Sequence, residues 1–549
     1  MDENQKFDDI VNRGMKEYFK RNPKIAISFG KEEYEKEVES GTKEHIEENL
    51  KWFSQWIEEL KQLNIEKLNF KNKISLEAME YYHNINLFMY RAYPLWKKEP
   101  NGLAYFQESI FLLFQRKGPT TNVAEAIIAY LTKLPKYLEE FQSRFDETPI
   151  PIVWRDLALK EVQSTSQFLQ TLAGAFNETS EDIVSLKDKL LKFFNEAESV
   201  IKTHVEWIKS LPVDSDKFAW ALGPEKFDEL LSLRKIPWDR ERILKKGNQQ
   251  FNSLFKKLKR LAKEIDPTKT LSEVIEDFFK KDQVPTFEEA LEHTQTEADR
   301  AKKFIKSHNL ASFPQEKLVI VETPPHLIHT VPSAAYYEPP YFGGVQPGIF
   351  LVTPSQDKEG SGGSSYTVIS NTMVHEAYPG HHLDCVCNNE FAPLPRLLGF
   401  SLETIEGWAH YCEEMMFQEG FYKDPKNAKS LIIGAQLFRA MRVILDIQLH
   451  CKQRTIEDAI KMLMNVLAMD ETTAEAEILR YTSTPGYNLS YLIGKLLIED
   501  LRREVEEKMG SKFSLKFFHD TILRSGDLPY YLLKEYFEEK IKNILSSNS

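Results

Sequence analysis

The chain of 549 residues has 71 basic and 83 acidic side chains, and its net charge of −12 argues against a nucleic-acid partner, because nucleic-acid binding requires a basic face. Four cysteines cannot form a disulfide framework and indicate a reducing compartment. Residues 1–6 are polar rather than signal-like, and no uninterrupted apolar run of about 18 residues predicts a membrane span, so we expect a cytoplasmic protein with no membrane partner.

The N-terminal half predicts one amphipathic helix after another. Between residues 40 and 310 apolar side chains recur at three- and four-residue spacing, for example at Ile46, Leu50 and Phe53. The predicted helices lie at about 76–90, 122–145, 155–176, 182–211, 239–265 and 285–308. Pro135 is expected to kink the second of them.

The sequence pattern changes near residue 316, where helical periodicity gives way to short runs of β-branched residues. They predict strands at 317–322, 348–353 and 366–369. An edge strand of such a sheet suits a peptidase, because it can pair with an extended peptide, and it suits a plain structural hairpin equally well. The polar, glycine-rich segment 356–365 is a candidate lid.

Helical periodicity returns after the strands and runs to the end of the chain. The predicted helices lie at about 371–389, 399–419, 426–451, 455–467, 471–481, 488–508, 513–524 and 528–545. The predicted fold class is therefore mainly α. We expect one continuous body of two lobes, residues 1–315 and 316–549, with a small sheet in the second lobe and a deep cleft between the lobes.

A His–Glu pair opens the segment HEAYPGHH at 375–382. Zinc hydrolases hold the metal with two imidazoles and use the Glu beside the first as general base. The second His usually follows at i+4, where this chain has Pro379. In a straight helix His382 lies within about 20° of His375 and His381 about 240° away. A bulge forced by the proline would bring His381 back, so the residues leave both histidines open.

A second metal-type segment covers residues 403–413. Zinc sites with an open position often combine two histidines with a Glu from a later helix, and Glu406 is placed for that role. Glu403, His410 and Glu413 share roughly its helical face. They are candidates either to hold the ligands in place or to bind the metal in their stead, and His382 is a further candidate for these roles.

These segments resemble the domain-of-unknown-function family 885, which is marked by H-E-x-x-P-G-H and E-G-W-A-x-Y-x-E. Both marks are present, as HEAYPGH at 375–381 and EGWAHYCE at 406–413. The similarity continues in an R-x-x-x-D-x-x-x-H stretch at 442–450 and in a segment at 485–494 similar to P-G-Q-x-x-S-Y-x-x-G. Residues 330–500 carry the resemblance.

The resemblance implies a zinc metallopeptidase with one zinc ion per chain. The implied ligands are His375, His381 and Glu406, with Glu376 as general base and a zinc-activated water as nucleophile. The family is also similar to helical zinc peptidases with a Glu ligand, of the gluzincin or neurolysin-like type, which implies short peptides as substrates. Asp384 stands where the family often has Gln, and such a departure would bear on substrate preference.

Further candidates lie downstream of the two motifs. Asp446 and His450 are four residues apart on one helix face, where a carboxylate–imidazole pair can orient a ring or handle a proton. Arg442, one turn earlier, is a candidate to bind a substrate carboxylate. Tyr491 is the candidate donor to the oxyanion, and Tyr487, which replaces the family's Gln, is a candidate substrate contact. Ordinary packing is the alternative reading for each of these side chains.

Two other classes of function fit the same residues. One is a zinc hydrolase of non-peptide amides or esters. The other is a non-catalytic helical scaffold whose histidines form a structural zinc site or a polar cluster. Glu376 beside His375 favours catalysis, because a structural site needs no base next to its ligand.

Overall fold

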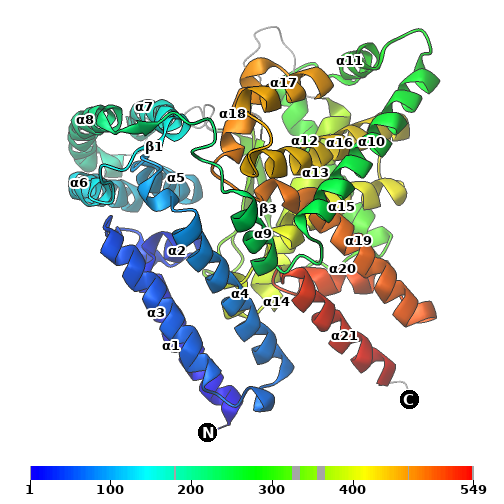
Figure 1. The fold of residues 1–549 in the computed structure, drawn as a ribbon, viewed down its shortest axis with the longest axis horizontal. Coiled ribbons are helices and arrows are strands. Elements are labelled where there is room, and N and C mark those ends of the chain that lie inside the picture. Colours follow the sequence, from blue (N-terminus) through cyan, green and yellow to red (C-terminus); the bar gives the residue numbers. More distant parts are fainter. Residues whose placement is uncertain (1, 178–180, 324–333, 355–364, 468, 547–549) are drawn as a thin grey trace.

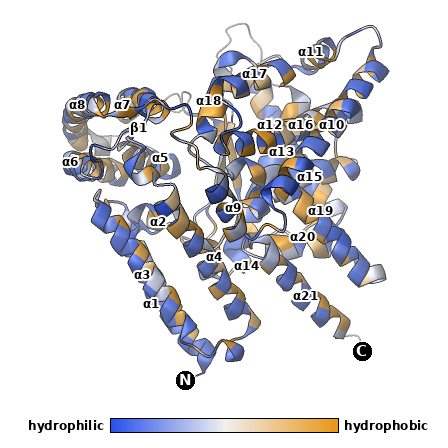
Figure 2. Cartoon of the chain, viewed as in Figure 1, coloured by the Kyte–Doolittle hydropathy of each residue, from blue (hydrophilic) through white to orange (hydrophobic). Residues whose placement is uncertain are grey.

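The computed structural model describes residues 2–177, 181–323, 334–354, 365–467 and 469–546, and the fold is mainly α as predicted (Figure 1). Along the helices hydrophobic and hydrophilic residues alternate, as expected for amphipathic helices around a common core (Figure 2). Among the described helices, none combines the length and the apolar composition needed to cross a membrane.

In the described residues, the N-terminal half contains twelve α-helices and two very short strands. The helices are α1 (Glu3–Arg21), α2 (Pro23–Ser28), α3 (Lys43–Lys61), α4 (Phe70–Ala92), α5 (Ala104–Lys117), α6 (Thr121–Gln142), α7 (Ile152–Asn177), α8 (Glu181–Ser210), α9 (Pro224–Leu233), α10 (Arg240–Ile265), α11 (Leu271–Asp282) and α12 (Phe287–Ser307). The strands β1 (Ile150–Pro151) and β2 (Val213–Asp214) pair in parallel. Side chains at Thr42, Asn69 and Thr120 cap the starts of α3, α4 and α6. Helix α6 continues through Pro135, so the proline does not end it.

The C-terminal half is helical after the sheet, as predicted. Its helices are α13 (Tyr366–Glu376), α14 (His381–Phe391), α15 (Leu402–Gln418), α16 (Pro425–His450), α17 (Ile456–Leu467), α18 (Glu471–Tyr481), α19 (Ser490–Met509), α20 (Leu515–Leu523) and α21 (Tyr530–Ser546). The single helix predicted at 371–389 is in fact two helices, because α13 ends at Glu376 and α14 begins at His381.

A three-stranded sheet precedes α13. Its strands are β3 (Leu318–Glu322), β4 (Ala334–Tyr337) and β5 (Gly348–Val352), with β5 in the middle, parallel to β3 and antiparallel to β4. The strands predicted at 317–322 and 348–353 are confirmed, and β4 was not predicted. The strand predicted at 366–369 is wrong. These residues form the first turn of α13, because the Ser365 side chain accepts a hydrogen bond from the Val368 N–H and caps a helix there.

The two halves of the chain are in contact. In Figure 1 helices α5 to α8 lie on the left of the view and α10, α15, α16 and α19 on the right. Helix α10 packs on α16, and α12 packs on α13, so helices from before residue 315 contact the C-terminal half directly. The lobe boundary at 315/316 and the deep cleft stay predictions. Apart from Ser365, the predicted lid lies outside the described residues.

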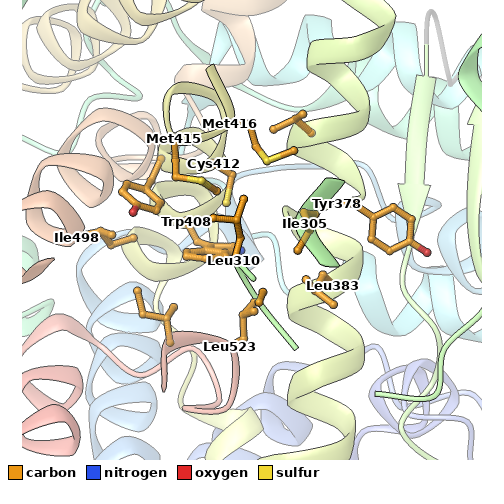
Figure 3. Packing of buried hydrophobic residues seen from close by; sticks show 14 of the residues in the cluster. Ile305, Leu310, Tyr378, Leu383, Trp408, Cys412, Met415, Met416, Ile498 and Leu523 are labelled. Carbon is orange, nitrogen blue, oxygen red and sulfur yellow. The ribbon is translucent and has the colours of Figure 1, made fainter. Parts of the chain in front are cut away.

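The largest hydrophobic cluster of the core surrounds α15, the helix that carries Glu406. Trp408 of α15 is fully buried in it, and side chains of α12, α14, α19 and α20 surround it (Figure 3). The labelled neighbours in that figure include Ile305, Leu383, Cys412, Ile498 and Leu523. Helix α15 is therefore held on several sides, which fixes the position of the residues on its opposite face.

Candidate metal centre

The His–Glu segment is split between two helices. His375 and Glu376 end α13, residues 377–380 form a connecting turn, and His381 is the first residue of α14. The turn is held by a hydrogen bond from the Gly380 N–H to the Val374 carbonyl at 3.0 Å and from the Trp408 indole to the Pro379 carbonyl at 2.9 Å. The predicted bulge within one helix is thus a complete break.

Gly380 is required for this turn. A Cβ atom at that position would lie 1.8 Å from the His375 carbonyl oxygen, closer than any non-bonded contact allows. The glycine in the H-E-x-x-P-G-H motif therefore lets the start of α14 approach the end of α13.

The turn brings His381, rather than His382, to His375. The His375 and His381 rings are 4.9 Å apart between centroids and perpendicular. His382 is fully buried on the other side, where its Nε2 lies 2.9 Å from Glu316 and its Nδ1 2.9 Å from the Tyr336 hydroxyl. Both nitrogens of His382 are therefore engaged away from His375.

Glu406 of α15 completes a group of three possible ligands. Its Oε2 lies 3.8 Å from Nε2 of His375 and 3.6 Å from Nε2 of His381. One ligand atom from each residue can be chosen so that all three lie within 4.8 Å of one another. Two imidazoles and a carboxylate at this separation are a donor set that suits zinc.

Each of two ligands has a partner that orients it. Nδ1 of His375 donates to Oε1 of Glu413 at 2.8 Å, which leaves Nε2 facing the other ligands. Oε1 of Glu406 accepts a hydrogen bond of 2.9 Å from the Tyr487 hydroxyl. Oε2 of Glu406 is buried and accepts no hydrogen bond from the described residues. That oxygen is free to bind a cation, so the residues present fit a metal ion.

Glu413 is itself held by positively charged and polar groups. Arg439 donates to its Oε1 at 2.9 Å, and the Asn371 amide donates to its Oε2 at 3.2 Å. Burial opposes its charge, but Arg439, the hydrogen bond from His375 and the nearby His410 hold the pKa of Glu413 well below its usual value. An ionised Glu413 fixes the tautomer of His375 that presents Nε2 to the site.

The electrostatics of the ligands are strongly coupled. Burial opposes a charge on His381, but the carboxylates of Glu406 and Glu376 outweigh it and raise the pKa of His381 to about 9. Burial likewise opposes a charge on Glu406, but the two histidines and the Tyr487 hydroxyl lower the pKa of Glu406 to about 2. A cation must displace the proton of His381, so metal binding should weaken as the pH falls.

Two phenols stand beside Glu406. The hydroxyls of Tyr487 and Tyr491 are 3.3 Å apart, and Tyr491 is buried. Tyr487, predicted as a substrate contact, is a direct partner of Glu406 in the structure. Tyr491, predicted as the oxyanion donor, lies one hydrogen bond further out, and its role stays a prediction.

Helices α15 and α19 approach so closely that their glycines touch. A Cβ atom on Gly407 would lie 2.4 Å from the backbone of Gly494, and one on Gly494 would lie 2.0 Å from the Glu403 carbonyl. Gly407 directly follows Glu406 in α15, and Gly494 comes three residues after Tyr491 in α19. Their absent side chains therefore set the distance between the candidate ligand and the candidate donor.

Asp446 and His450 are both fully buried, and they form hydrogen bonds with backbone groups. Asp446 accepts hydrogen bonds from the backbone N–H groups of Gly486 at 2.9 Å and Asn488 at 3.0 Å, and so holds the turn that carries Tyr487. His450 bonds through Nε2 to the Tyr481 carbonyl at 2.9 Å and accepts at Nδ1 from a backbone N–H at 3.4 Å. These contacts give no support to the predicted catalytic role of His450, because backbone groups occupy both nitrogens.

Arg442 and His410 each lie beside a glutamate. Arg442 is mostly buried, bonds to Glu477 at 2.5 Å and lies 5.0 Å from the centre of the Tyr491 ring. A buried ion pair is a poor receptor for a substrate carboxylate, so its predicted role finds no support here. His410 is fully buried 3.5 Å from Glu413, and burial together with Arg439 lowers the pKa of His410 to about 3.

Asp384 lies in a second group of carboxylates, together with Asp527. The Asn388 amide donates to Asp384 at 3.3 Å and to Asp527 at 2.8 Å. Burial raises the pKa of Asp384 well above its usual value, and the charge of Asp527 adds to this. Its predicted influence on substrate preference stays a prediction.

Sequence reasoning missed the residues that anchor His382. Glu316 accepts hydrogen bonds from His382 at 2.9 Å and from the Tyr378 hydroxyl at 2.8 Å, and pairs with Lys302. No local motif surrounds Glu316, so a single sequence gives no signal for this contact.

Solved structures of other proteins share the fold. One described as "the putative lipoprotein from Colwellia psychrerythraea" has a TM-score of 0.84 at 19% identity, over 99% of this chain and 100% of that chain. Another, described as "a putative lipoprotein of unknown function from Shewanella oneidensis", has a TM-score of 0.76 at 19% identity, over 96% and 99%. At such identity the likeness shows the fold alone. No curated protein matches the chain. The family described as "Bacterial protein of unknown function (DUF885)" matches residues 23–536, and the chain therefore belongs to the DUF885 family.

Proposed function

We propose that this protein is a zinc-dependent peptidase that hydrolyses peptide bonds of short peptides. The observation that carries the proposal is the convergence of His375, His381 and Glu406 from three helices, with ligand atoms within 4.8 Å of one another. Glu376 directly follows the first of them and is close enough to His381 to raise its pKa. Ligands with a carboxylate beside them suit a hydrolytic site.

A zinc ion bound by these three side chains would supply a Lewis acid that activates water and polarises a carbonyl group. Glu376 removes a proton from the attacking water and passes it to the leaving amine. Tyr491 donates a hydrogen bond to the oxyanion that develops on the substrate. Glu413 and Tyr487 keep His375 and Glu406 in the orientations that the reaction needs.

The test compares the wild-type protein with Glu376→Gln. With N-blocked peptides of three to six residues, we expect Glu376→Gln to lower kcat by about 10²–10⁴-fold. Zinc content, measured by atomic emission, should stay at one ion per chain in both proteins. Glu390→Gln, an exposed carboxylate on α14, is the matched control and should keep full activity.

The outcomes separate the rival functions. Hydrolysis of small amides or esters without cleavage of any peptide would replace the peptidase with a hydrolase of another substrate class. Zinc binding without any hydrolysis would favour the non-catalytic scaffold. Unchanged peptide cleavage by Glu376→Gln would refute the proposed mechanism.

We also propose that the protein works in a reducing, cytoplasmic compartment. All four cysteines are free thiols, and three of them are buried. Burial raises the pKa of Cys387 and Cys412, which keeps these thiols protonated and unreactive. Mass spectrometry of thiols alkylated in intact cells would detect all four in the reduced form.

A further inference from the structure

A cluster with unbalanced charge lies beside the candidate metal centre. One carboxylate, Glu477, forms an ion pair with Arg442 at 2.5 Å and accepts hydrogen bonds from Arg480 at 3.1 and 3.2 Å. The Tyr481 hydroxyl donates to the same carboxylate at 2.6 Å. Two guanidinium groups thus share a single counter-ion, and the cluster keeps one positive charge in excess.

The excess charge is available at Arg480. Three arginines pack on the two phenols near Glu406, and the side chains of Arg439 and Arg442 are only 14% and 13% exposed. The side chain of Arg480 is 40% exposed. It bonds to Glu477 through one nitrogen, Nη2, so the rest of its planar fork can receive another carboxylate.

Arg480 lies close to the candidate ligands. Its guanidinium carbon is 5.7 Å from the centre of the Tyr487 ring, and the hydroxyl of that ring is 2.9 Å from Glu406. Added along this path through the phenol ring, these distances place Arg480 no farther than about 11 Å from Glu406. An extended peptide advances by ~3.3–3.6 Å per residue, so this upper limit corresponds to at most about three residues.

We propose that Arg480 binds the free α-carboxylate of a peptide substrate. The protein would then cleave near the carboxyl end and release a fragment of up to about three residues. This inference rests on the proposed peptidase function and specifies where along the peptide it acts. The sequence suggested Arg442 for this role, and the inference assigns it to Arg480 instead. The side chain of Arg480 is the more exposed of the two, so a ligand can reach it.

The experiment uses two probes that differ only at the carboxyl end, N-acetyl-tetra-alanine and its C-terminal amide. With zinc-loaded wild-type protein we expect KM for the acid to be about tenfold lower than for the amide, at similar kcat. Arg480→Gln should raise KM for the acid about tenfold and leave the amide unchanged. Arg480→Lys, which keeps the charge without the fork, should fall between the two.

A matched control and a fold check accompany these variants. Arg503 lies on the next helix, α19, and its side chain is 71% exposed, so Arg503→Gln should leave both KM values unchanged. Glu477 keeps Arg442 and Tyr481 as partners when Arg480 is replaced, so the melting temperature of Arg480→Gln should stay within a few degrees of wild type.

Binding separates this inference from the proposed function. Calorimetry of both probes with zinc-loaded Glu376→Gln measures affinity without turnover. Tighter binding of the acid that disappears in the Glu376→Gln/Arg480→Gln double variant supports the carboxylate site, even if the wild-type protein hydrolyses neither probe. Equal affinity for acid and amide, no binding of either probe, or an acid preference that survives the loss of Arg480 would overturn it.

Discussion

Nδ1 of His375 lies 2.8 Å from Oε1 of Glu413, which stands two helical turns after Glu406 on α15. The contact explains why the second motif carries two carboxylates. Glu406 presents an oxygen with no hydrogen bond to the two histidines, whereas Glu413 is buried, ionised and bonded to the first imidazole. One helix thus supplies a ligand and the support for another ligand.

Replacing Glu413 by Gln should weaken zinc binding by about 10–100-fold, because the amide no longer fixes the tautomer of His375. Competition with a chelator of known zinc affinity measures this change. Glu414→Gln is the matched control, since Glu414 pairs with Lys495 instead. Equal zinc affinity in both variants would show that Glu413 does not support the site.

The two neighbouring phenols should respond differently to loss of their hydroxyls. Tyr487→Phe removes the 2.9 Å hydrogen bond to Glu406 and should lower zinc affinity about tenfold. Tyr491→Phe should leave zinc affinity unchanged and lower kcat about 100-fold, because it removes a donor to the oxyanion. Chelator competition and steady-state kinetics on both variants distinguish the roles. Unchanged kcat in Tyr491→Phe would remove that residue from the mechanism.

The contact between α15 and α19 predicts a large difference between two Gly→Ala variants. Gly494→Ala places a methyl group against the Glu403 carbonyl and should destabilise the fold by about 1–3 kcal/mol or more. Gly434→Ala, within α16 and with no atom within 4 Å of the added Cβ, should be neutral or up to about 1 kcal/mol stabilising. Urea unfolding followed by circular dichroism tests both variants. Equal stability would show that the helices separate at little cost.

Glu316 predicts a pH dependence of stability. Burial opposes its charge, but hydrogen bonds from His382, Lys302 and Tyr378 lower the pKa of Glu316 to about 2, below its ordinary value of 4.5. A carboxyl whose pKa is depressed by folding stabilises the native state above its unfolded pKa, and that contribution fades as the pH falls. Glu316→Gln should therefore be less stable than wild type by about 2 kcal/mol at pH 7. The difference should shrink between pH 4.5 and 2. Denaturant unfolding at pH 7 and pH 3 measures both gaps, and a gap that does not change with pH would contradict this account.

The fold class and most helix positions could be predicted because hydrophobic periodicity reports directly on which face of a helix is buried. The errors arose where one side chain or a distant contact decided the outcome. Ser365 capped a helix on a β-branched run, so local propensity for a strand at 366–369 lost to a hydrogen bond.

The site residues also divide into those that a local motif identifies and those that a distant contact decides. His375 and Glu406 lie within regular helices and could be identified from their motifs. The choice between His381 and His382 could not be made from spacing, because it depends on the path of the 377–380 turn, which Trp408 fixes from another helix. The greater exposure of Arg480 compared with Arg442 is likewise a result of packing, and helical spacing carries no information about it.

The origin of the three candidate ligands on α13, α14 and α15 also bears on how the protein folds. Before α15 docks, a folding chain has two imidazoles near each other and no carboxylate, so it captures an ion weakly. High affinity would appear only in the native state, and any ion bound there would add its binding free energy to native stability, about 2.7 kcal/mol at a free concentration 100 times Kd. Metal supply would then govern how long the chain resists proteolysis, apart from any effect on catalysis.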